Sequence, residues 1–151
     1  MLFDASVKYL AANGDLLCYI QYVHGPMHPD IRSFARAPHA RVMADLLASN
    51  KRSLLVAHPE AGKTLAHRSE LEMWIGMQTE LSFKDPDTPP PSALYVMGTL
   101  DKQAKPQVHD IRNTIQYNPR YRELFPHARP DIKEGWEKDV FFLKRPQQKH
   151  R

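Results

Sequence analysis

The stretch Ser53-Leu54-Leu55-Val56-Ala57-His58-Pro59-Glu60-Ala61-Gly62-Lys63-Thr64 decides the predicted fold of this chain. A short apolar run ends in a loop, the loop closes on Gly62-Lys63-Thr64, and a helical pattern continues to about Met77. A strand, a glycine-containing turn and a helix in this order are typical of a phosphate-binding loop, or P-loop. The sequence therefore predicts such a loop at 57–64.

The residue types of this loop suit the chemistry of a bound phosphate. Gly62 lets the backbone approach an anion without a side chain in the way, and the amide groups at a helix N-terminus favour negative charge. Lys63 would reach the β- and γ-phosphates of a nucleotide, and the Thr64 hydroxyl would hold Mg²⁺. We therefore predict that ATP and Mg²⁺ bind here. The predicted binding residues are Ala57, His58, Pro59, Glu60, Ala61, Gly62, Lys63 and Thr64.

Two positions of the loop depart from the usual pattern. Ala57 stands where the full pattern has glycine, but a residue that ends a strand with an ordinary φ angle need not be glycine. Glu60 brings a negative charge beside the expected phosphates, so a neighbour such as His58 or Arg68 would have to counter it. The alternative is a plain helix N-terminus, in which Thr64 caps the helix and Lys63 is solvated.

Composition sets wider bounds on the class of protein. The chain has 151 residues, the size of one domain, and its 42% hydrophobic content is that of a globular protein. A formal net charge of +4 is compatible with a polyanionic partner without demonstrating one. The single Cys18 excludes an intrachain disulfide and suits a reducing cytoplasm. We expect no membrane span, no signal peptide and no metal beyond nucleotide-bound Mg²⁺.

The first fifty residues are predicted to form a helical region that leads into the core. Residues 24–38 contain several proline and glycine residues, and we expect a loop there with at most one helical turn at 31–35. The last predicted helix of this region should turn Val42, Leu46 and Leu47 inward. The expected helices of residues 1–50 span 3–13, 16–23 and 39–48.

Residues 51–143 are predicted to form a partial P-loop ATPase core, followed by a basic tail at 144–151. Apolar runs indicate strands at 54–56, 93–97 and 140–143, which alternate with helices after the loop and at 101–117. The helix at 101–117 should have one apolar face, formed by Ala104, Val108, Ile111 and Ile115. The predicted fold class is therefore α/β. It would be an incomplete, three-layer parallel sheet of the P-loop NTPase type, preceded by the N-terminal helices.

The order of features along nearly the whole chain resembles the N-terminal ATPase domain of phage terminase large subunits, the motors that package DNA. The most specific points of likeness are Asn118-Pro119-Arg120-Tyr121, then Leu124-Phe125-Pro126, then Trp136. Gln103-Ala104 and Ile111-Arg112 also fall where that family has a helix. The resemblance implies that the complete protein couples ATP hydrolysis to DNA translocation. It also implies as partners double-stranded DNA, the portal protein and the small terminase subunit, in the cytoplasm of a phage host.

Two departures from that family concern catalysis. Packaging motors often carry an arginine inside the phosphate loop, and positions 58–61 have none. Hydrolysis also needs an aspartate at the end of a buried strand to hold Mg²⁺, usually beside a second carboxylate. The 93–97 run ends in Gly98-Thr99 and the 140–143 run in Lys144-Arg145, so both Walker B carboxylates are missing. We therefore expect a truncated domain that binds ATP and hydrolyses little or none of it.

Two other function classes remain open from the sequence. Another P-loop NTPase, such as a kinase-like protein, could use an arginine-rich lid. A small basic DNA-binding or assembly protein could contact phosphates through Lys51-Arg52 and the C-terminal tail. The lid residues would be Arg112, Arg120, Arg122 and Arg129, and the tail residues Lys144, Arg145, Lys149 and Arg151.

Overall fold

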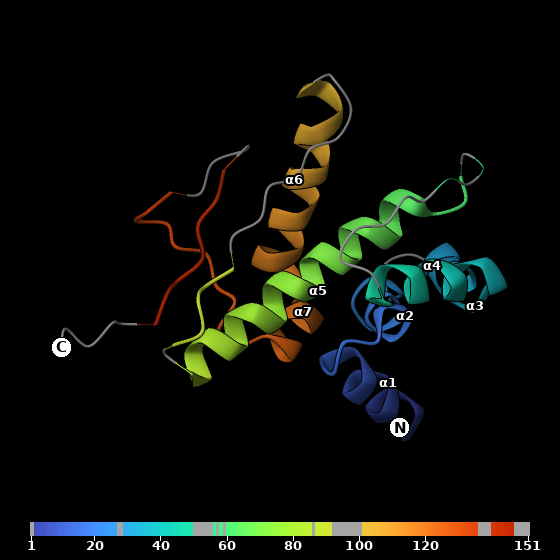
Figure 1. The fold of residues 1–151 in the computed structure, drawn as a ribbon, viewed down its shortest axis with the longest axis horizontal. Helices are drawn as coiled ribbons and strands as arrows, with labels where there is room; N and C mark the ends of the chain where they lie inside the picture. Colours follow the sequence, from blue (N-terminus) through green and yellow to red (C-terminus); the bar gives the residue numbers. More distant parts are fainter. Residues whose placement is uncertain are drawn as a thin grey trace. The chain divides into compact units, whose positions relative to one another are not determined.

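A computed structural model gives the fold as two compact units, Met1–Met73 and Trp74–Arg151. Helix α5 begins in the first unit and ends in the second (Figure 1). The structure describes residues 2–26, 29–49, 56, 58, 60–85, 87–91, 101–135 and 140–146. Its helices are α1 (Leu2–Ala12), α2 (Leu16–Tyr19), the π-helix η1 (Ile20–His24), α3 (Pro29–Arg36), α4 (Pro38–Ser49), α5 (Lys63–Lys84), α6 (Asp101–Tyr117) and α7 (Pro119–Leu124).

The predicted α/β fold is wrong. Helices make up 68% of the interpretable part of the chain, and no strand or sheet occurs there. Val56, expected at the end of the first strand, is 84% exposed and lies outside any regular element. An apolar run this short does not by itself distinguish a strand from other structures. Residues 54–55 and the run 93–97 lie outside the described residues.

Within the third expected strand, 140–143, Leu143 forms an isolated antiparallel bridge with Pro130, and the described residues contain no regular strand. The chain turns back on itself at 131–135, and the Asp131 amide donates to the Phe142 carbonyl oxygen at 2.8 Å. Pro130 has no amide hydrogen, so it cannot extend the pairing into a regular ladder. The segment is therefore a local turn-back and not a strand of a parallel sheet.

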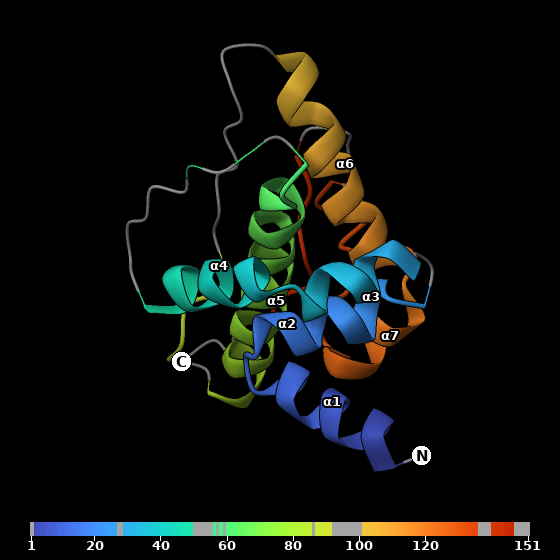
Figure 2. The same cartoon turned by 90° about the vertical axis from the view of Figure 1, so that its right-hand side faces the viewer.

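The first unit has its core among α1, α2, η1, α3 and α4, which contact one another in turn (Figure 2). Ala11, Tyr19, Ile20 and Val23 are at most 1% exposed and form the centre of this core. Asp15 caps α2 by accepting a hydrogen bond from the Cys18 amide at 2.9 Å, as its side chain and position suggest. The helix predicted for 16–23 is confirmed, although its second half is a π-helix.

Two expectations for the first unit are wrong. The predicted loop 24–38 contains α3, which Pro29 starts from the first helical position, where proline is tolerated. In α4 the core face is formed by Ala40, Met43 and Ala44. Val42 is 69% exposed, so its predicted inward position is wrong, whereas Leu46 and Leu47 are half-buried.

In the second unit the end of α5 contacts the segment after α7, and α6 contacts α7. Ile111 and Ile115 of α6 are buried, as predicted from their spacing, together with Tyr121 and Phe125. Phe125 lies against Gly76, where an added Cβ would come 2.3 Å from the ring. No helix in the described part of the chain is long and apolar enough to cross a membrane.

Candidate functional site

The predicted phosphate loop lies at the start of helix α5. The Ala61 amide donates to the His58 carbonyl oxygen at 3.2 Å, which closes a turn directly before the helix. Glu60 and Gly62 both have positive φ angles, 69° and 79°. The left-handed conformation is unfavourable for a residue with a side chain such as Glu60, by about 1–2 kcal/mol. The backbone therefore changes direction twice before α5 begins at Lys63.

The Lys63 side chain folds back over this loop. Its ammonium group donates to the His58 carbonyl oxygen at 2.7 Å. An ammonium group has three hydrogens and can donate to more than one acceptor. Thr64 is exposed in the first turn of the helix. Of the predicted binding residues, the structure brings together His58, Glu60, Ala61, Gly62, Lys63 and Thr64; Ala57 and Pro59 lie outside the described residues.

Gly62 has a packing role that the sequence did not reveal. A Cβ atom built at this position would lie 2.3 Å from Cε2 of Phe34, on α3. The Phe34 ring also contacts the ring of His39 edge-on, with centroids 5.9 Å apart. The absence of a side chain at Gly62 is thus required by the approach of an aromatic ring from α3, and the loop is tied to the helical core of the first unit.

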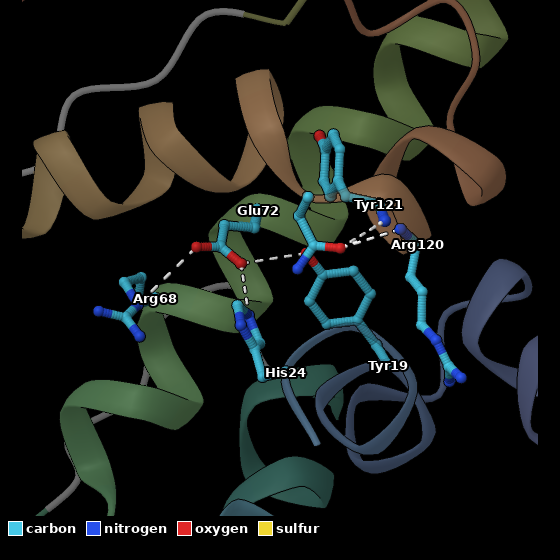
Figure 3. A network of polar contacts seen from close by, with 7 residues as sticks. Tyr19, His24, Arg68, Glu72, Arg120 and Tyr121 are labelled. Atoms are coloured by element: carbon cyan, nitrogen blue, oxygen red, sulfur yellow. Dashed lines mark hydrogen bonds and ion pairs between the residues drawn. The ribbon is translucent and has the colours of Figure 1, made fainter. Parts of the chain in front are cut away.

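A second group of polar residues, which the sequence analysis missed, surrounds Glu72 on the same helix (Figure 3). Its carboxylate is 0% exposed, and its Oε2 atom receives the Tyr19 hydroxyl at 3.1 Å and lies 2.8 Å from Nε2 of His24. An ionised carboxylate only accepts hydrogen bonds, so Nε2 of His24 is the donor. Nε of Arg68, one turn earlier on α5, is 3.8 Å from the other oxygen. Hydrogen bonds therefore reach Oε2 of this buried carboxylate, whereas Oε1 has the longer ion pair with Arg68.

A periodic signal for Glu72 exists in the sequence. Ala66, Ser69 and Met73 are buried on α5, and Glu72 falls on the same face at the spacing of an inward position. A carboxylate at an inward position of a helix requires polar partners. The identity of those partners could not be predicted, because Tyr19 and His24 are about fifty residues away.

The Cys18 thiol, in the first unit, lies in an environment that lowers its reactivity. Burial, followed by the neighbouring Asp15 carboxylate, raises the pKa of the Cys18 thiol to about 11. Burial also acts to raise the pKa of Asp15, but the hydrogen bond from the Cys18 amide and the nearby Arg41 outweigh it, so this pKa is lowered. Cys18 is therefore protonated at neutral pH and unsuited to attack an electrophile.

Two histidines pair with carboxylates outside this cluster. The hydrogen bond to Glu70 raises the pKa of His67, against the effect of burial. In the second unit, Glu80 accepts from both the amide and Nδ1 of His127, at 2.7 and 2.6 Å, and the His127 ring stacks on Phe83. This arrangement fixes the segment after α7 to the end of α5. Among the described residues, no three His, Cys, Asp or Glu side chains come together as metal ligands.

The succession of residues that resembles terminases has a local structural explanation in the second unit. The Asn118 side chain caps α7 by accepting from the amides of Arg120 and Tyr121 at 2.9 and 3.2 Å. Pro119 takes the first helical position, and Phe125 fills the core beside Gly76. Trp136 lies outside the described residues. A cap, a proline and a buried aromatic residue are features that unrelated helices also use.

The arginines considered as a lid lie on α6, on α7 and in the segment after α7, all in the second unit. The Arg129 Nε group donates to the Pro126 carbonyl oxygen at 2.8 Å, a contact within its own turn. Lys144 and Arg145 are exposed, whereas Lys51-Arg52, Lys149 and Arg151 lie outside the described residues. The placement of these basic residues in the described part of the chain supports neither an arginine-rich lid nor a nucleic-acid-binding surface.

No protein-family model matches this chain, and the searches of curated proteins and of solved structures found no match either.

Proposed function

We propose that the loop 58–64 and the N-terminus of α5 bind the phosphate groups of a nucleotide, with ATP and Mg²⁺ as the ligand. One observation carries this proposal: Lys63 opens a 22-residue helix directly after Gly62, and its ammonium group is held over the turn at His58. A long helix offers unpaired amide groups and the positive end of its dipole at this point. The site needs these groups and one cation, and it does not require a parallel sheet.

Each of the three residues Gly62-Lys63-Thr64 has a part in this site. The Lys63 ammonium group can share its hydrogens between the His58 carbonyl oxygen and a phosphate oxygen. The exposed Thr64 hydroxyl would reach Mg²⁺ held by the nucleotide. Glu60 is exposed, so its charge is screened by water. We further propose, on the sequence resemblance alone, that the chain is the nucleotide-binding part of a phage packaging motor with DNA, portal protein and small terminase subunit as partners.

Binding without efficient hydrolysis is part of the proposal. A hydrolytic site needs a carboxylate that can hold Mg²⁺ and orient water. Glu72 lies on the helix that follows the loop, but its side chain is buried and already accepts from Tyr19 and His24. This carboxylate is therefore engaged in packing the first unit and unsuited to bind a nucleotide-bound metal ion.

Titration of the protein with a fluorescent ATP analogue and Mg²⁺ tests the proposal. Loss of a charge-assisted hydrogen bond of about 1.5–3 kcal/mol should weaken binding by about 10- to 150-fold in Lys63→Ala. Lys84→Ala is the matched control, because Lys84 is an exposed lysine at the opposite end of the same helix. We expect the control to bind like the unmodified protein. Equal binding by Lys63→Ala, or no binding by the unmodified protein, would refute the proposal.

A further inference from the structure

The π-helix η1 is an unusual element, and the residues at its two ends contact a single side chain of α5. The Gly25 amide donates to the Ile20 carbonyl oxygen at 3.2 Å, a bond across five residues in place of the usual four. Such turns are rare, and they are frequent at functional sites. Something must therefore favour this hydrogen-bond pattern over the α-helical pattern of the preceding α2.

Glu72 provides that preference. Tyr19 directly precedes η1, and His24 is its last residue. The two side chains are five residues apart, and both contact the Oε2 atom of Glu72 (Figure 3). In an α-helix, residues five apart are separated by about 140° around the axis, so they cannot face one acceptor together. The five-residue pattern places more residues in each turn, which brings Tyr19 and His24 closer together around the axis. Hydrogen bonds to one buried oxygen atom of Glu72 thus stabilise the π-helical conformation and not the α-helical one.

We propose that the Tyr19–His24–Glu72 contact is a conformational latch that holds residues 20–24 in the π form. When Glu72 no longer accepts these bonds, the segment returns to α-helical hydrogen bonding. A π-turn contains one residue more than an α-turn, so this change displaces the chain that follows Gly25. Helix α3 is next in the chain and contacts η1.

The latch has a path to the phosphate loop within the first unit. Phe34 on α3 occupies the space beside Gly62, so a displacement of α3 changes the packing of the loop. The charged and titratable groups at Glu72 are Tyr19, His24 and Arg68. The latch therefore couples a buried polar cluster to the start of α5. Only its consequence for ligand affinity rests on the proposed function.

Nuclear magnetic resonance tests the latch without any ligand. Scalar couplings across hydrogen bonds identify the carbonyl group that each amide contacts. We expect the unmodified protein to show Gly25 bonded to Ile20, and Glu72→Leu to show Gly25 bonded to Gln21. Glu72→Leu should also change the contact between the Phe34 ring and Gly62. Glu70→Gln is the control, because Glu70 is two residues away and pairs with His67 at the surface; it should keep the Gly25–Ile20 bond.

A milder variant covers the case in which Glu72→Leu does not fold. Tyr19→Phe keeps the ring and removes one donor to Glu72, and its Gly25 amide should exchange with solvent at least several-fold faster relative to the amides of α5. A Gly25–Ile20 bond that survives in Glu72→Leu overturns the proposal, as does unchanged exchange in Tyr19→Phe. A π-turn that relaxes while the Phe34–Gly62 contact stays unchanged overturns the link to the loop. None of these measurements uses a nucleotide, so the latch can be refuted or supported independently of the proposed nucleotide binding.

Discussion

Gly62→Ala tests whether the loop is fixed by the packing that the structure describes. The new Cβ atom would lie 2.3, 2.7 and 2.9 Å from three atoms of the Phe34 ring. A left-handed φ of 79° costs an alanine about 1–2 kcal/mol, and overpacking typically adds about 1–3 kcal/mol. Phe34 is only half-buried, so its ring can turn aside in part. We therefore expect a loss of about 2–3 kcal/mol in the free energy of unfolding.

A double-mutant cycle separates the two causes of this loss. In a Phe34→Ala background the ring is absent, so Gly62→Ala should cost only its backbone contribution of about 1–2 kcal/mol. Urea unfolding followed by circular dichroism gives the four free energies of the cycle. Non-additivity of about 1 kcal/mol supports the contact. An equal cost of Gly62→Ala in both backgrounds would refute the reasoning, because the Phe34 ring would then have no part in it.

Three further predictions concern other parts of the chain. Gly76→Ala should lower the free energy of unfolding by about 1–2 kcal/mol in urea unfolding. Overpacking against the buried Phe125 ring outweighs the roughly 1 kcal/mol that alanine gains in helix propensity. An unchanged unfolding midpoint would contradict this packing. The pKa of Asp15 is lowered in the folded state, so its contribution to stability is complete above the ordinary carboxyl range near 3.8 and is lost as the pH falls. Asp15→Asn should therefore show a shallower loss of stability between about pH 5 and 2, and an identical pH profile would count against the pairing with Arg41 and Cys18. Cys18, with a pKa of about 11, should react with iodoacetamide at pH 8 at least about 100-fold more slowly than an unperturbed thiol, and alkylation at the free-thiol rate would disprove its environment.

The sequence predicted helices well where local signals agree. Asp15 before Leu16 is a cap that acts within three residues, and α2 begins where that side chain indicates. Asn118-Pro119 was interpreted only as the end of the preceding helix, although Asn118 also caps α7. Ile111 and Ile115 face inward because a four-residue spacing alone places them on one side of α6. These features depend on near neighbours in the chain, so a single sequence contains the information.

The fold class could not be obtained in the same way. The run that ends at Val56 and the run 140–143 are both too short for periodicity to identify a strand, and the phosphate-loop interpretation supplied a sheet that the described residues lack. The start of α5 at Lys63 was predicted, since a glycine before a helical pattern marks the boundary. The contact of Phe34 with Gly62 was not, because it joins residues that only tertiary packing brings together.

The contacts of Glu72 also could not be predicted from the sequence, because they depend on tertiary packing. Its helical spacing marks it as an inward carboxylate, but the π-turn that presents Tyr19 and His24 to it arises from the contact itself. Intrinsic propensity gives no indication of a π-helix at 20–24, since isoleucine, tyrosine and valine favour no such turn. In a sequence, a polar group that is buried by long-range packing can be recognised only because it occupies an inward position in the helical spacing.

The most direct test of nucleotide binding at the start of α5 is an amide chemical-shift titration of the unmodified protein with ATP and Mg²⁺. The account predicts saturable shifts concentrated at Ala61 to Ala66, where the loop turns into α5, with much smaller shifts in Lys63→Ala. Inorganic triphosphate should shift the same amides, because the phosphates supply the contacts. Shifts confined to other regions, or none at millimolar ATP, would contradict the account.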